Sequence, residues 1–79
     1  MTTPDYIKHA IEAGLACDNV EVDGDGQHFR ALIVSSAFEG LSRIKRHQLV
    51  YGALGDRMRA EIHALSMQTL TPAERDQGN

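Results

Sequence analysis

The chain has 79 residues, of which 42% are hydrophobic, and it carries a formal net charge of −3 with no tryptophan. A chain of this size can hold one hydrophobic core and little else, so we expect a single domain over residues 1–79 with no room for a deep enzyme cleft. The acidic balance argues against a surface devoted mainly to binding phosphates, although it allows a local basic patch.

Cys17 is the only cysteine, which excludes an internal disulfide and a metal site made only of thiolates from one chain. The first residues contain no basic stretch followed by an apolar run. Nowhere do about eighteen apolar residues follow one another, the length needed to span a bilayer. We therefore expect a cytoplasmic protein that is neither secreted nor membrane-spanning.

The N-terminal segment predicts a helix. Thr3 has the character of an N-cap, and Pro4 follows at the first helical position, where the missing N–H of proline is tolerated. Ile7 and Ile11 recur at helical spacing and predict one buried stripe. Gly14 is expected to close this helix in a left-handed conformation.

Two strands are predicted next. Val20 and Val22 alternate with acidic residues, which is the pattern of a half-buried strand. The Gly-Asp-Gly sequence at 24–26 predicts a turn. Residues 29–35 are apolar on both faces, as is typical of a central strand, so we expect the two strands to form a hairpin.

A second helix is expected after Ser42, which can act as its N-cap. Gly55 is expected to break this helix, and Asp56 could cap a short continuation to Ala60. The apolar residues that gather on one side at 3.6 residues per turn are Ile44, Val50, Tyr51, Leu54 and Met58.

Alternation resumes over residues 62–70 and predicts a third strand that carries His63, Leu65, Met67 and Thr69 on one face. Residues 71–72 (Thr-Pro) are expected to start a short helix or a frayed tail. The order of elements predicts an α+β domain with helices over one face of the sheet. In it the second and third strands are parallel and adjacent.

The stretch 38–54 resembles the signature of the BolA family, and most of the chain, from about 20 to 72, takes part in the resemblance. The matching residues are Phe38, Gly40, Ser42, Arg46, His47, Val50 and Leu54. Residues 63–66 (His-Ala-Leu-Ser) are similar to the C-terminal histidine segment of the family. Residues 24–29 resemble its short-loop branch, which is known as IbaG.

The resemblance implies a class II KH-like fold, in which helices pack on one face of a three-stranded mixed sheet. It also implies a non-enzymatic adaptor that pairs with a monothiol glutaredoxin around a shared [2Fe-2S] cluster. The glutaredoxin and glutathione would supply thiolates, and His63 and His28 would be the ligands of this chain. Histidine in place of thiolate raises the reduction potential of such a cluster. The free chain is expected to be a monomer or a weak homodimer.

Several readings stay open beside this one. A cluster of basic residues around the second helix could bind DNA, which would make the chain a transcriptional regulator, or could be an ordinary solvated face. These residues are Arg43, Lys45, Arg46, Arg57 and Arg59. Residues 52–55 spell the GxxG of KH domains, but a helix cap explains them better. His47 is expected to be structural and hydrogen-bonded. No nucleophile stands with a base, which argues against a hydrolase or transferase.

Overall fold

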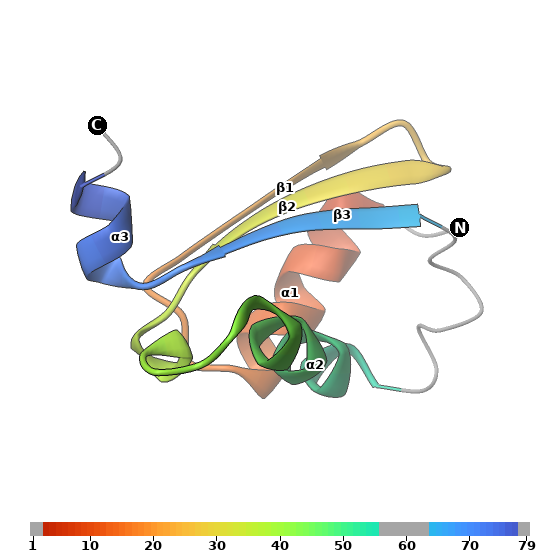
Figure 1. Cartoon of the computed structure of the whole chain (residues 1–79). Helices are drawn as coiled ribbons and strands as arrows, with labels where there is room; N and C mark the ends of the chain where they lie inside the picture. The colour runs from red at the N-terminus through yellow and green to blue at the C-terminus, as the bar shows by residue number, and fades with distance from the viewer. Residues whose placement is uncertain (1–2, 56–63, 78–79) are drawn as a thin grey trace.

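The computed structural model of the chain describes residues 3–55 and 64–77. Two helices lie under a curved sheet, and a short C-terminal helix lies beyond one end of it (Figure 1). In chain order the elements are α1 (Pro4–Gly14), β1 (Asn19–Gly24), β2 (His28–Val34), the 3₁₀ helix η1 (Ser36–Phe38), α2 (Arg43–Leu54), β3 (Ala64–Leu70) and α3 (Pro72–Gln77).

The sheet has the strand order β1-β2-β3. β1 and β2 form the predicted antiparallel hairpin, in which Val20 pairs with Ile33. β2 and β3 are parallel and adjacent, and their register runs from His28 opposite Ala64 to Val34 opposite Leu70. The prediction of a central second strand is confirmed, although β2 begins and ends one residue earlier than expected.

The hydrophobic core lies between this sheet and the helices α1 and α2. Alternate residues of each strand point toward the helices, so these two helices cover one face and leave the other face of the sheet to solvent. The buried members of the core are Ile7, Ile11, Val20, Phe29, Ala31, Ile33, Phe38, Val50 and Leu54. The α+β prediction, with a three-stranded mixed sheet and helices on one face, is therefore confirmed.

The predicted helix caps are present. Thr3 Oγ1 accepts a hydrogen bond of 3.2 Å from the N–H of Tyr6, and Ser42 Oγ accepts one of 3.3 Å from the N–H of Lys45. Gly55 ends α2 with a positive φ of 77°, and its N–H donates to the Tyr51 carbonyl at 3.0 Å. Because a positive φ strains any residue with a Cβ, glycine at this position fixes where α2 ends.

The predicted left-handed cap at Gly14 is wrong. Gly14 is the last residue of α1, and the chain leaves the helix through Leu15 in an extended conformation. A Cβ at Gly14 would lie only 2.8 Å from both the Cα and the Cβ of Ala53 in α2. Glycine is needed here because two helices approach closely, which the local sequence does not reveal.

The predicted apolar stripe of α2 is partly wrong. Val50 and Leu54 are buried as expected, but Ile44 is 70% exposed and Tyr51 is 53% exposed. The buried side of the helix is rotated toward Arg46, which is only part-exposed. Counting apolar residues placed the stripe incorrectly, because a long cationic side chain occupies part of the inner face.

Some predictions lie outside the described residues. They concern Met58, the continuation from 56 to 60 and the first two residues of the predicted third strand, 62 and 63. Within the described ranges, no helix combines the length and apolar character that crossing a bilayer requires.

Candidate metal and partner-binding site

The hairpin turn between β1 and β2 places His28 at the first position of β2. Asp25 Oδ1 accepts hydrogen bonds from the backbone N–H of Gln27 at 2.9 Å and of His28 at 2.8 Å. The N–H of Asp25 in turn donates to the His28 carbonyl at 3.2 Å. A short polar side chain therefore closes the turn, as aspartate commonly does, and fixes the backbone from which the His28 ring projects.

The same hydrogen bonds set the electrostatics of the turn. The N–H groups of His28 and then Gln27 lower the pKa of the Asp25 carboxyl, so this side chain is an anion at neutral pH. The His28 side chain is 75% exposed, and its Nδ1 lies 4.0 Å from Asp25 Oδ2, beyond hydrogen-bonding distance. His28 thus presents an exposed imidazole, a side chain that commonly binds metal ions.

The register of the parallel strands relates this site to the other predicted ligand. His28 is the partner of Ala64, the first residue of β3, and both stand at the end of the sheet that carries the hairpin turn. His63 precedes Ala64 in the sequence and lies outside the described residues. The fold therefore brings the chain position that follows His63 next to His28, although the two histidines are 35 positions apart in sequence.

The described residues do not complete a metal site by themselves. Among residues 3–55 and 64–77, no group of three or more histidine, cysteine or acidic side chains is placed to hold an ion. Cys17 packs against the core, and its Sγ lies 3.3 Å from the Leu15 carbonyl. Burial, followed by the charges of Glu12 and Asp18, raises the pKa of this thiol, so its thiolate is disfavoured.

The predicted basic cluster separates into different kinds of residue. Arg43 and Lys45 are exposed on the first turn of α2. Arg57 and Arg59 lie outside the described residues. The Arg46 side chain is only 13% exposed and points inward. The three arginines and one lysine other than Arg46 remain candidates for a partner or DNA.

Arg46 is held by contacts within the chain. Its Nε donates to the Leu41 carbonyl at 2.9 Å, and its Nη1 donates to the Thr69 carbonyl at 3.0 Å. Nη1 and Nη2 also bind Glu74 Oε1 and Oε2 at 2.7 and 3.2 Å. The guanidinium lies 5.9 Å from the centre of the Phe38 ring. These contacts link α2 to η1, to the loop that follows it, to β3 and to α3, so Arg46 has a structural role. Few N–H donors of its guanidinium remain free to bind a phosphate.

Glu74 is a residue that the sequence reasoning missed. Thr71 and Glu74 form a capping box for α3: the Glu74 N–H donates to Thr71 Oγ1 at 3.1 Å, and the Thr71 N–H donates to Glu74 Oε1 at 2.8 Å. The hydrogen bond from Arg46, followed by that from Thr71, lowers the Glu74 pKa to about 2. The spacing Thr71-Pro72-Ala73-Glu74 was the available signal, since it matches the capping-box pattern.

Two minor sequence features can also be compared with the structure. Leu54 is buried and Gly55 caps α2, so the expected core position and helix cap within residues 52–55 are confirmed. His47 is half-buried in α2. Its Nε2 is enclosed without a hydrogen-bond partner in the described part of the chain, so the predicted hydrogen bond is wrong for this atom.

The fold and this site together define a class: a small α+β module with a mixed sheet, one covered face and an exposed histidine at the hairpin end. A family profile described as BolA-like protein matches residues 6–74. The chain belongs to the BolA-like family, and the predicted resemblance is confirmed.

Individual relatives agree with this assignment. The solved structure of a BolA protein homologue from Coxiella burnetii superposes with a TM-score of 0.86 and 47% identity, covering 96% of this chain and 99% of that one. The acid stress protein IbaG of Escherichia coli is 41% identical over 69 residues, which is 86% of this chain and 82% of that protein. SufE-like protein 1 of Arabidopsis thaliana is 46% identical over 66 residues, 84% of this chain but only 16% of that longer protein.

Proposed function

We propose that the chain is an adaptor, not an enzyme, that binds a monothiol glutaredoxin and supplies His28 and His63 as ligands to a shared [2Fe-2S] cluster. The observation that carries the proposal is the exposed His28 imidazole, opposite the residue that follows His63 in the chain. Consecutive Cα atoms are about 3.8 Å apart and neighbouring strands about 4.8 Å apart, so the pairing of His28 with Ala64 supports the proposal that both histidines bind one cluster.

The residues of the chain suit a cluster shared with a partner protein better than a cluster bound by this chain alone. An imidazole is a borderline ligand that suits iron, whereas Cys17 is packed and its thiol pKa is raised. Two histidines leave half of a four-ligand set unfilled, and a partner must provide the remainder as thiolates. When bound, such a cluster supplies an electron-accepting centre whose potential is raised by the histidines. Cluster binding and partner binding are therefore expected to occur together.

The alternative role, DNA binding by the basic helix, gains less support. The internal contacts of Arg46 remove the central cation of the predicted cluster, leaving Arg43 and Lys45 among the described members. The chain has a net charge of −3, so the negative potential of the rest of its surface opposes the approach of DNA to these exposed cations. DNA binding, if it occurred, would weaken steeply with added salt.

The test is a titration of the iron-free chain into a monothiol glutaredoxin loaded with a [2Fe-2S] cluster and glutathione. Visible absorption and circular dichroism report the ligands of the cluster, and size-exclusion chromatography with iron analysis reports the complex. We expect a new spectrum and an iron-containing heterodimer. His63→Ala should abolish the spectral change, and His28→Ala should weaken it.

His9→Ala is the matched control, because His9 is also an exposed histidine but lies on α1. This variant should reproduce the wild-type spectrum. An unchanged spectrum on mixing the wild-type proteins, or an equal loss in all three variants, would refute the proposal. A DNA complex that forms at low salt and needs Arg43 and Lys45, without any cluster spectrum, would favour the alternative.

A further inference from the structure

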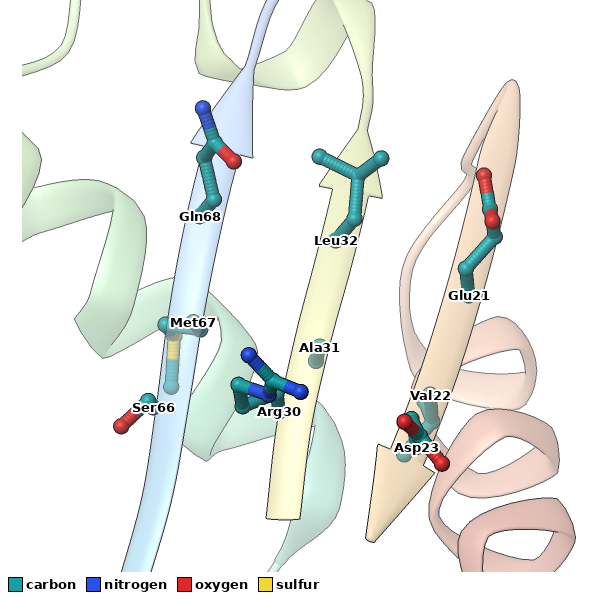
Figure 2. A pocket seen from close by; sticks show the side chains of 9 residues that line it. All are labelled: Glu21, Val22, Asp23, Arg30, Ala31, Leu32, Ser66, Met67 and Gln68. Carbon is teal, nitrogen blue, oxygen red and sulfur yellow. The ribbon is translucent and has the colours of Figure 1, made fainter.

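The helix-free face of the sheet carries a charged surface next to His28. Two shallow hollows of about 470 and 520 Å³ adjoin there and share Asp23, Arg30 and Ser66. The first extends toward the C-terminal half of β2, and the second extends to the hairpin turn with Asp25 and His28. Figure 2 shows Arg30 on β2 between Asp23 on β1 and Ser66 on β3. Arg30 therefore lies where the two hollows meet.

The charges of this surface do not neutralise one another in the structure. Asp23 and Arg30 are direct partners across the antiparallel ladder, yet no ion pair of 4.0 Å or less joins them. Both residues are exposed. Asp23 Oδ1 instead accepts the N–H of Gly24 at 2.9 Å, which turns this carboxylate toward the hairpin. One cation and two carboxylates, those of Asp23 and Asp25, thus face a common hollow.

This arrangement complements a zwitterion. Arginine binds a carboxylate through two parallel N–H donors, and an ammonium group is satisfied by carboxylates such as Asp23 and Asp25. The α-amino and α-carboxyl groups of an amino acid stand on one carbon, which suits Asp23 and Arg30 at paired positions on one face of the sheet. A phosphate would be repelled by the two acids, and an apolar ligand would leave all three charges without partners.

We infer that Asp23, Asp25, Arg30 and Ser66 form a binding site for the α-amino-acid end of a small peptide, with glutathione as the occupant. The choice of glutathione rests on the proposed function, in which glutathione would supply a thiolate to the cluster that His28 also binds. The glutamyl end of glutathione carries the required ammonium and carboxylate. Binding of that end at Arg30 would hold the peptide beside His28, so the chain would help to position a thiol that it cannot supply itself.

The experiment uses the full chain without iron or glutaredoxin, so its outcome is independent of cluster formation. Reduced glutathione is titrated into the ¹⁵N-labelled chain, and amide shifts give the site and the dissociation constant. We expect saturable shifts at residues 23–30 and at Ser66. Arg30→Gln should weaken binding by about tenfold or more, the loss expected for a charge-assisted pair. Arg43→Gln, which removes an exposed cation on α2, should leave it unchanged.

Changes in the ligand provide a second test. Glutathione acetylated on its glutamyl amine should bind weakly, whereas the ester of its glycyl carboxylate should bind like glutathione. Absence of saturable shifts in the wild-type chain overturns the inference, and so does equal binding by Arg30→Gln and Arg43→Gln. Either result would leave the cluster titration intact, so failure of this site is distinguishable from failure of the proposed function.

Discussion

The two ends of the sheet use acidic side chains in similar local motifs but with different outcomes. At the hairpin end, Asp25 accepts two backbone N–H groups, and the neighbouring His28 stays in solvent. At the other end, Glu74 also accepts a backbone N–H, but its carboxylate closes on Arg46. The two ends differ in whether the fold places a charged partner from another element beside the carboxylate. Where the fold supplies one, the polar group stabilises the structure; where it does not, the group remains available for binding.

The largest expected effect is that of Arg46→Ala. The change leaves the part-buried carbonyls of Leu41 and Thr69 without their charged donor. We therefore expect the free energy of unfolding to fall by about 3 kcal/mol, not counting the loss of the ion pair with Glu74. Urea denaturation followed by circular dichroism measures the change. Arg43→Ala alters an exposed arginine of the same helix and should have almost no effect. Equal stability of the two variants would contradict the structural role of Arg46.

Two glycines offer the same contrast between packed and open surroundings. Gly14→Ala should destabilise the fold by about 2 kcal/mol, because its Cβ would overlap Ala53 in α2. Gly52→Ala in α2 should stabilise by up to about 1 kcal/mol, since alanine favours helix and a Cβ there meets no atom within 4 Å. Thermal unfolding of both variants measures the two signs. A stabilised Gly14→Ala protein would disprove the close helix contact.

The ion pair between Arg46 and Glu74 predicts that stability depends on pH. The Glu74 pKa falls from 4.5 to about 2 in the folded chain. A depressed pKa contributes stability that is complete above the unfolded value and is lost as pH falls toward the folded one. The stability difference between wild type and Glu74→Gln should therefore be full above about pH 5 and should shrink between about 4.5 and 2. Urea midpoints at pH 6 and pH 3 measure it.

The control for the pH experiment is Glu39→Gln, which alters an exposed carboxyl outside this network. Its difference from wild type should be smaller than that of Glu74→Gln at pH 6. If the Glu74→Gln difference were as large at pH 3 as at pH 6, the carboxylate would not be the stabilising form.

The smallest effect on stability is expected at the hairpin end of the sheet. Asp25→Ala removes the acceptor for the N–H groups of Gln27 and His28, so these two amides should exchange with solvent faster while global stability falls only slightly. Asp25→Asn keeps an acceptor oxygen and should exchange more slowly than the alanine variant. Hydrogen exchange followed by nuclear magnetic resonance distinguishes the variants. Unchanged exchange in Asp25→Ala would show that the carboxylate does not hold the turn.

The candidate site was only partly visible in the sequence. His28 could be placed at a hairpin because the Gly-Asp-Gly turn and the following apolar strand are local signals. The sequence predicted that the second and third strands are parallel neighbours, but the register that pairs His28 with Ala64 was not predictable. The assignment of His63 as a ligand remains a prediction, since it depends on the family resemblance and on a residue outside the described ranges.

The sequence by itself determined the order of the helices and strands and their approximate bounds, because caps, glycines and alternation act over a few residues. Only the tertiary structure decided that Arg46 links α2 to β3 and that Gly14 lies where α1 packs closely against α2. It also decided that Arg30 faces an open hollow. Each of these roles depends on a partner far away in the chain, and packing, not local propensity, chooses that partner.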